Sequence, residues 1–141
     1  NSWALGVASY GAPAIEPGGS RIFVAAYDDN QLIEFDRLAG EVVEAHDAVE
    51  PPVRVTWAAG EVWATSGVNK TVDAYSPDTL ERRWTAELAD QTQGIWYDPN
   101  RDLVWVAVFG DNEVLAIDRS TGDVIGRASV QQPIDLFPLP R

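Results

Sequence analysis

Few side chains in this 141-residue sequence belong to the types that carry chemistry. The absence of cysteine excludes disulfides, thiolate zinc sites, iron–sulfur clusters and cysteine nucleophiles. The one histidine, His46, stands beside Asp47 in a polar stretch, and no serine lies in a nucleophile-elbow context that could complete a triad with it. We therefore predict no catalytic residue and expect His46 to be a surface side chain.

Two short clusters of carboxylates and amides are candidates for binding. Residues 28–30 read Asp-Asp-Asn and residues 111–113 read Asp-Asn-Glu, and such oxygens are the ligands that a hard cation such as Ca²⁺ prefers. Asp and Asn are also favoured in tight hairpin turns, because they tolerate left-handed backbone conformations. The spacing is not that of an EF-hand. We expect turn residues here, with Ca²⁺ binding as the alternative, and no other cofactor.

Composition restricts the class of protein and its partners. With 45% hydrophobic and 23% charged residues the chain predicts one globular domain without a membrane-spanning segment. Ten basic and twenty-two acidic residues give a net charge of −12, which repels nucleic acid and anionic lipid. Because the chain begins with Asn1 rather than Met, we expect that an initiator or leader has been lost or that the sequence was cut from a longer one, and that the protein is exported.

A repeat of about forty residues is the main organising signal. Each copy has an apolar segment, a polar turn, an alternating segment and a second turn. The apolar segments are residues 22–25, 62–65 and 104–107, and the alternating segments are residues 32–35, 72–75 and 114–117. A short apolar segment before each block and a polar one after it complete four strands. Repeated units of four strands are typical of β-propeller blades, which we place at residues 13–51, 52–91 and 92–132.

The repeat also assigns roles to its aromatic residues and to the ends of the chain. Phe23, Trp63 and Trp105 occupy one equivalent position, and we expect them to pack each blade on the next. In residues 1–12, Trp3, Leu5 and Val7 alternate and predict a strand that completes an adjacent blade. Residues 133–141 would begin a further blade or form a tail, since two prolines interrupt a ladder strand there.

The third copy resembles the YVTN type of β-propeller repeat. The resemblance lies in the strings LVWVA at 103–107, DNEV at 111–114 and IDRSTGDV at 117–124, and the first copy shares much of it. The second copy departs from it at Ser76 and Leu80, so we expect its last turn to differ. The resemblance implies an exported or surface binding protein. Related propellers include lactonases, lyases and subunits of redox complexes.

Three blades create a packing problem. Propellers close with about four to eight blades, so three blades leave two apolar flanks that a soluble monomer does not normally expose. We expect a second copy, a protein partner or further sequence to cover these flanks. A symmetric pairing of three blades with three is the simplest closed arrangement.

The topology predicts where a ligand would bind. In an up-and-down blade, the turn between the second and third strands lies at the same end as the link to the next blade. This end gathers the predicted ligand-binding residues Asp28, Asp29, Asn30, Asn69, Asp111 and Asn112, together with Glu50, Gln93, Gln131 and Gln132. Acidic and amide side chains suit a cation, a basic protein segment or a polyhydroxylated ligand better than a phosphate. Solvated loops are the alternative.

The sequence thus predicts an all-β protein that acts as a non-catalytic binding or assembly module at an extracellular, periplasmic or surface location. Its acidic, amide-rich loops would face a partner or ligand. One alternative is a lactonase-type or lyase-type enzyme with a divalent metal at the mouth of the central channel. Another is a propeller subunit of a redox complex.

Overall fold

The computed structural model describes residue 9 and residues 11–136, which form three antiparallel sheets of four strands. Blade 1 comprises β1 (Ala14–Ile15), β2 (Arg21–Ala26), β3 (Gln31–Asp36) and β4 (Glu41–Asp47). Blade 2 comprises β5 (Arg54–Ala58), β6 (Glu61–Ser66), β7 (Thr71–Tyr75) and β8 (Arg82–Glu87). Blade 3 comprises β9 (Thr92–Asp98), β10 (Leu103–Val108), β11 (Glu113–Asp118) and β12 (Val124–Ser129). These sheets fall within the blade ranges predicted from the repeat.

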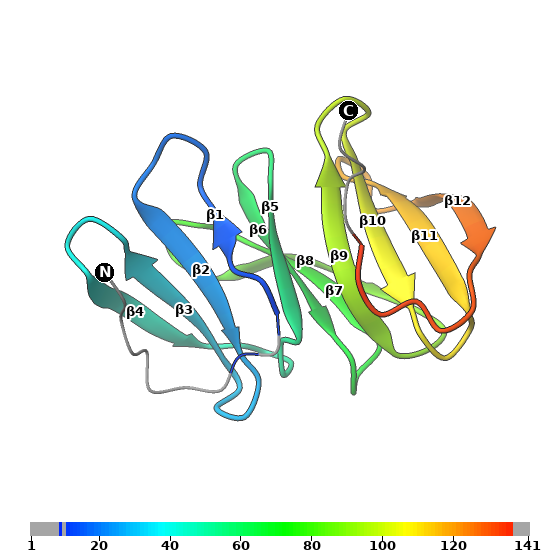
Figure 1. The fold of residues 1–141 in the computed structure, drawn as a ribbon, viewed down its shortest axis with the longest axis horizontal. Coiled ribbons are helices and arrows are strands. Elements are labelled where there is room, and N and C mark those ends of the chain that lie inside the picture. The colour runs from blue at the N-terminus through cyan, green and yellow to red at the C-terminus, as the bar shows by residue number, and fades with distance from the viewer. Residues whose placement is uncertain (1–8, 10, 137–141) are drawn as a thin grey trace.

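The blades stand side by side with their first strands innermost. Each sheet follows the order of the sequence, and β5 lies between β1 and β9 (Figure 1). Short hairpin turns connect the strands within a blade, and a longer link connects the fourth strand to the first strand of the next blade. This arrangement confirms the predicted propeller blades. The described residues form no helix that could cross a membrane.

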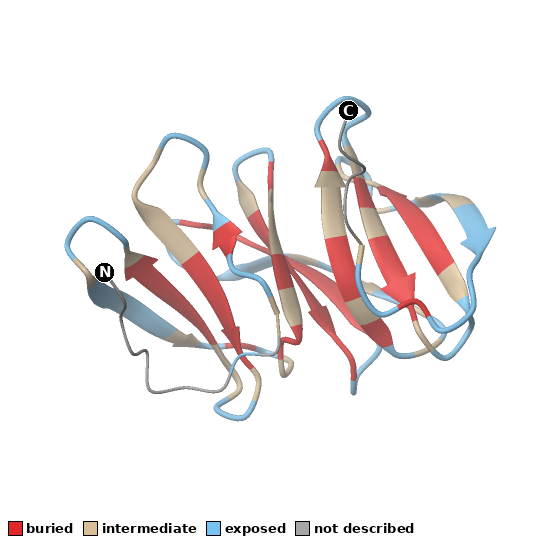
Figure 2. Ribbon diagram, in the orientation of Figure 1, coloured by how far each residue is buried: buried red, intermediate tan, exposed pale blue. Residues whose placement is uncertain are grey.

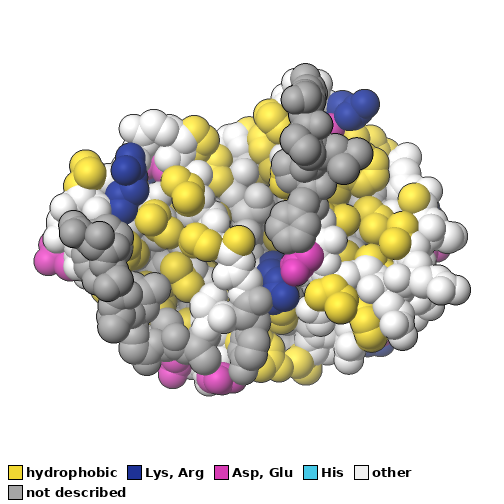
Figure 3. Space-filling view, viewed as in Figure 1, with side chains coloured by type: hydrophobic (Ala, Val, Ile, Leu, Met, Phe, Trp, Pro, Cys, Tyr) yellow, Lys and Arg dark blue, Asp and Glu magenta, His cyan; other side chains and the backbone are white. Residues whose placement is uncertain are grey.

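Burial falls from the middle of each blade to its outer edge (Figure 2). Every residue of β7 is buried, whereas β4 and β12 are mostly exposed. The charged fourth strands therefore form the outer edges, as the sequence predicted. Hydrophobic side chains nevertheless remain visible over all three blades on the face shown in Figure 3.

The alternation of side chains decides what each face contacts. In β10, Val104, Val106 and Val108 belong to the cluster between blades 2 and 3. The intervening Trp105 therefore points to the opposite face, on which the described residues place no further blade. Phe23 and Trp63 are 0% and 1% exposed between blades, which confirms their packing role, whereas Trp105 is only partly buried.

The turns between the second and third strands share one backbone design. Asn30, Lys70 and Asn112 adopt φ values of 56°, 61° and 55°, within the left-handed region. The carbonyl of each accepts a hydrogen bond from the link that follows its blade, at 2.8 Å from Ala48, 2.7 Å from Leu88 and 2.8 Å from Val130. Two of the three positions are asparagines that the sequence assigned to turns for this reason. The links are thereby fixed against the turns.

The turns between the third and fourth strands are stabilised by aspartates. The Asp36 carboxylate accepts hydrogen bonds from the backbone N–H groups of Ala39 and Leu38, and these bonds lower the pKa of Asp36. Bonds from the Ser120 hydroxyl and the Thr121 and Ser120 N–H groups lower the pKa of Asp118 in the same way. Each turn stabilises the ionised carboxylate.

The corresponding turn of blade 2 differs in its side chains, as expected, because Ser76 replaces the capping aspartate, but it keeps the same backbone hydrogen bond. The N–H of Leu80 donates to the Ser76 carbonyl at 2.8 Å, as Gly40 does to Asp36 and Gly122 to Asp118. Leu80 adopts φ 51°, where the other two copies use glycine at 78° and 79°. The leucine tolerates this conformation because its side chain is fully buried in the cluster between blades 1 and 2. Burial of an apolar side chain offsets the backbone cost of about 1–2 kcal/mol.

Candidate ligand-binding site

The six predicted ligand-binding residues lie in three turns at one end of the blades, here called the link end. Asp28, Asp29 and Asn30 lie in the β2–β3 turn, Asn69 lies in the β6–β7 turn, and Asp111 and Asn112 lie in the β10–β11 turn. The hydrogen bonds from Ala48, Leu88 and Val130 place the three turns beside the links, as the topology predicted. The turns belong to different blades, so they do not form one cluster.

The side chains of these turns serve the backbone in part. The Asn112 Oδ1 atom accepts a hydrogen bond from the Gln132 N–H at 2.9 Å. The Asn30 Oδ1 atom is buried and has no hydrogen-bond partner in the described part of the chain. Within residues 9 and 11–136, no group of three or more His, Asp or Glu residues could hold a metal ion. Ca²⁺ binding at these turns therefore stays a prediction.

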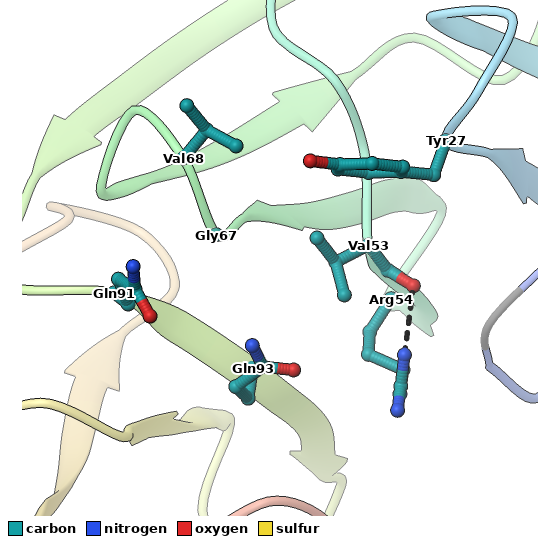
Figure 4. Close-up of a pocket in the computed structure, with 7 residues that line it drawn as sticks. All are labelled: Tyr27, Val53, Arg54, Gly67, Val68, Gln91 and Gln93. Carbon is teal, nitrogen blue, oxygen red and sulfur yellow. Dashed lines mark hydrogen bonds between the residues drawn. The ribbon is translucent and has the colours of Figure 1, made fainter.

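A cavity of about 340 Å³ opens at the link end, and other side chains form its wall (Figure 4). It is lined by Tyr27, Val53, Arg54, Gly67, Val68, Gln91 and Gln93. These residues come from all three blades: from the β2–β3 turn, from Val53 and the start of β5, from the β6–β7 turn, and from the link into β9 and β9 itself. Of the residues that the sequence gathered at this end, Gln93 alone lines the cavity. We call this cavity the link-end pocket.

Arg54 supplies the positive charge of the link-end pocket. Its side chain is 14% exposed, its Nε donates to Asp135 Oδ1 at 3.2 Å, and its Nη1 donates to the Val53 carbonyl at 3.2 Å. A guanidinium carries five N–H donors, so three donors have no protein acceptor among the described residues. Sequence reasoning missed Arg54, although one charged residue between two valines of an innermost strand was a signal.

The two glutamines are held in place through their main chains. The Gln93 carbonyl accepts a hydrogen bond from Thr65 Oγ1 at 2.7 Å, and the Gln91 carbonyl accepts one from the Phe109 N–H at 2.8 Å. Their side-chain amides make no hydrogen bond to the described residues, and Figure 4 shows them across the cavity from the Tyr27 ring. Both amides are therefore available to a ligand.

A second cavity of about 370 Å³ lies on the other side of Arg54. It is lined by Ser9, Gly11, Ala12, Arg54, Val55, Ile95, Asp135 and Leu136. Residues 134–136 close one side, because the Gly94 N–H donates to the Ile134 carbonyl at 2.7 Å. A Cβ atom at Gly94 would lie 2.7 Å from that carbonyl oxygen, so this close approach requires glycine. Arg54 thus belongs to the walls of both cavities.

His46 lies away from both cavities. It is on the outer strand β4, where it pairs with Leu32 of β3, and it is partly exposed. Its imidazole makes no hydrogen bond to the described residues, so the structure places no serine nucleophile beside it.

The flanks of the outer blades form a second candidate functional surface. On blade 3, Trp96 and Trp105 are paired in register on the face turned away from blade 2, and both are partly exposed. On blade 1, Ile15 is 54% and Leu38 77% exposed. Other residues of the outer face of blade 1 are buried, namely Val24, Ala26 and Ile33. This face is therefore less open than the sequence led us to expect. The predicted strand in residues 1–12 falls largely outside the described residues.

Comparisons with known proteins show the fold and no closer relationship. The chain is similar to hydrazine synthase from Kuenenia stuttgartiensis, with a TM-score of 0.81, 15% identity, and coverage of 90% of this chain and 38% of that one. It is similar to BamB from Moraxella catarrhalis, with a TM-score of 0.73, 14% identity, and coverage of 90% and 38%. It is also similar to the WD40 repeats of RRP9, with a TM-score of 0.75, 11% identity, and coverage of 87% of this chain and 39% of that one.

These structures are β-propeller proteins, and the chain spans about two fifths of their length. No protein-family model and no curated protein matches the chain. The propeller fold is thus shown, while the YVTN type of repeat stays a prediction from the sequence.

Proposed function

We propose that this chain is a non-catalytic β-propeller module that assembles with a second copy through its open flanks and presents the link end to a ligand. The equivalence between the open flanks and the two junctions inside the chain carries this proposal. Each junction uses equivalent strand positions for its aromatic contact and an outer turn of the next blade for its ion pair, and the open flanks present the same elements without a partner.

The first pair of positions packs apolar side chains. Phe23 of blade 1 stacks on Trp57 of blade 2 with ring centroids 5.8 Å apart. Strand register makes Trp63 and Tyr97 the corresponding pair, and both belong to the cluster between blades 2 and 3. The next pair in the series is Trp105, on the open flank of blade 3, with Ile15, on the open flank of blade 1.

The second pair of positions joins the start of one blade's second strand to an outer turn of the next blade. Arg21 contacts Asp78 at 2.8 Å, and Glu61 contacts Arg119 at 3.6 Å. The next pair in the series is Leu103 of blade 3 with the turn of blade 1 that carries Arg37 and Leu38. Leu103 and Leu38 would supply an apolar contact there. Two copies joined through both flanks would close a ring of six blades, within the usual range of about four to eight.

The chemistry of the link-end pocket favours binding over an enzymatic role. A lactonase or lyase of this architecture needs a divalent metal and an acid or base near the channel. The link-end pocket offers a guanidinium, two amides and a phenol instead. This set favours binding. A location outside the cytoplasm belongs to the proposal and depends on the resemblance to YVTN repeats.

The solution mass tests the assembly. We expect light scattering to give about twice the 15.4 kDa of one chain. Ile15→Glu changes a side chain that is 54% exposed, so it should fold normally but return the mass to that of one chain. Trp105→Glu should do the same from the other flank. Val43→Glu is the matched control, since Val43 is 56% exposed on the outer strand β4.

The opposite outcome is equally clear. A folded wild-type monomer in which Trp96 and Trp105 are quenched freely by acrylamide would contradict the proposal. So would a dimer that survives both flank variants.

A further inference from the structure

The link-end pocket has an unusual charge for this protein. The chain carries a net charge of −12, yet Arg54 is the one ionised side chain among the described residues that line the cavity. None of the six acidic and amide residues predicted to bind a ligand contributes to the wall. The pocket therefore differs in chemistry from the acidic turns of the same end.

The guanidinium of Arg54 keeps binding capacity that the protein does not use. Asp135 contacts it through Nε alone, and the Val53 carbonyl takes one hydrogen of Nη1. The remaining donors lie on the two terminal nitrogens, which are the atoms that bind a carboxylate in a bidentate manner. Because the side chain is only 14% exposed, water solvates these donors poorly. An anionic acceptor would satisfy them.

From these contacts we propose that the link-end pocket binds a small hydroxylated carboxylate, such as a sugar acid, with its carboxylate on Arg54. The amides of Gln91 and Gln93 each offer donors and an acceptor, which suits hydroxyl groups. The Tyr27 ring and the side chain of Val53 give an apolar surface for the C–H face of a sugar ring (Figure 4). A volume of about 340 Å³ accommodates a ligand of this size.

The overall negative charge does not prevent this binding. At physiological ionic strength the Debye length is about 8 Å, so carboxylates farther than this from Arg54 act weakly on a ligand that touches it. Asp135, which contacts Arg54 Nε at 3.2 Å, lies closer, and its charge opposes the binding of a carboxylate. A charge-assisted bidentate contact is also stronger than a neutral hydrogen bond. The site should therefore select against the neutral analogue of the same sugar.

This inference names a ligand class for the binding role proposed above, and it can be tested independently of assembly. D-Glucuronate and D-glucose differ at one carbon, so isothermal titration with both probes isolates the carboxylate. We expect glucuronate to bind at least about tenfold more tightly than glucose, because the free-energy contribution of a hydrogen bond to a charged group corresponds to a change in affinity of this size. Chemical-shift mapping should place the largest changes at Gln91, Gln93 and the Arg54 side chain.

Variants assign the contact to the named side chains. Arg54→Gln should weaken glucuronate binding about tenfold or more while leaving any glucose binding unchanged. Arg127→Gln is the matched control, because this arginine is 61% exposed on the outer strand β12. Gln93→Glu keeps the shape of the side chain but adds a negative charge to the wall, so it should also abolish glucuronate binding. Unlike Arg54→Gln, this variant leaves the Arg54–Asp135 ion pair intact.

Three results would overturn the site: equal affinity for the two sugars, no binding of glucuronate at millimolar concentration, or unchanged affinity in Arg54→Gln. Each can occur in a protein that still assembles, since the pocket lies within one chain. Conversely, a monomeric wild type that binds glucuronate would contradict the assembly alone.

Discussion

The two junctions between blades solve one packing problem with different side chains. Between blades 1 and 2, Arg21 lies over Phe23 and Trp57 at 5.8 and 6.0 Å from the ring centroids. It also donates to Glu16 and Asp78, each at 2.8 Å, and to the carbonyl of Pro77. This junction combines stacked rings with a cation, and the hydrogen bond from Arg21 holds the pKa of Glu16 low.

The junction between blades 2 and 3 reverses the charges. Glu61 stands where Arg21 stood, and it contacts Arg119 at 3.6 Å and Trp63 Nε1 at 3.2 Å. Arg119 in turn donates to Asp102 at 2.7 Å, which lowers the pKa of Asp102. Arg21 and Glu61 occupy equivalent positions, whereas their partners Asp78 and Arg119 lie one position apart in the equivalent turn. Register therefore fixes which elements meet across a junction, and charge complementarity fixes which side chains pair there.

The core of the second junction is also more apolar. Glu34 in blade 1, Ala74 in blade 2 and Ala116 in blade 3 occupy one register position, opposite Phe23, Trp63 and Trp105 respectively. Only blade 1 places a carboxylate there, and that residue is 8% exposed. We expect the second junction to depend on packing and the first to depend partly on charge.

Removing the central aromatic residue of a junction should have the largest effect. Trp63→Ala deletes a side chain that is 1% exposed and packs on Trp84 at a centroid distance of 5.1 Å. We expect a loss of about 3–5 kcal/mol in the free energy of unfolding, measured with urea. Phe23→Ala should cost less within this range, because Arg21 and Trp57 can close part of the cavity. Equal or reversed losses would show that Arg21 and Trp57 do not close the cavity left by Phe23.

The left-handed turn of blade 2 provides a smaller and more specific test. Leu80→Ala removes a fully buried side chain from the first junction and should cost about 2–5 kcal/mol. Leu80→Gly removes more of the side chain, yet at φ 51° glycine relieves backbone strain of about 1–2 kcal/mol.

We therefore expect the glycine variant to be the more stable of the two in urea unfolding, which reverses the usual order inside secondary structure. If alanine is the more stable residue at position 80, the turn of blade 2 does not carry the strain inferred from its backbone.

The repeat allowed the architecture to be predicted from the sequence, but most residues of the link-end pocket could not be predicted from it. Three aligned copies suffice to place four strands in each blade, because alternation and turn residues recur at fixed offsets. The departure at Leu80 was recognised, but its consequence was not, since sequence alone does not show that a buried contact can replace glycine in a left-handed turn. The six turn residues lie beside the links, as the topology predicted, but Arg54 and Tyr27 line the pocket through contacts between blades that the repeat does not encode.

The smallest predicted effect concerns Glu34 and depends on pH. Burial raises the pKa of Glu34, while the nearby charge of Arg21 opposes the rise. The folded state therefore holds this proton to a higher pH than the unfolded chain does, so stability falls as pH rises through the window between the two pKa values. Asp36 and Asp118 act in the opposite sense, because their lowered pKa values add stability that is lost as pH falls through their folded pKa values.

Glu34→Gln should therefore raise the melting temperature at neutral pH, and the gain should vanish once the pH is below the ordinary pKa of a glutamate. Glu41→Gln, at an exposed position of β4, is the control and should show no such window. If Glu34→Gln instead lowers stability at neutral pH, attraction to Arg21 outweighs burial. The Glu34 carboxylate would then belong to the charge network of the first junction. The first junction would in that case differ from the second in having a stabilising charge inside its core.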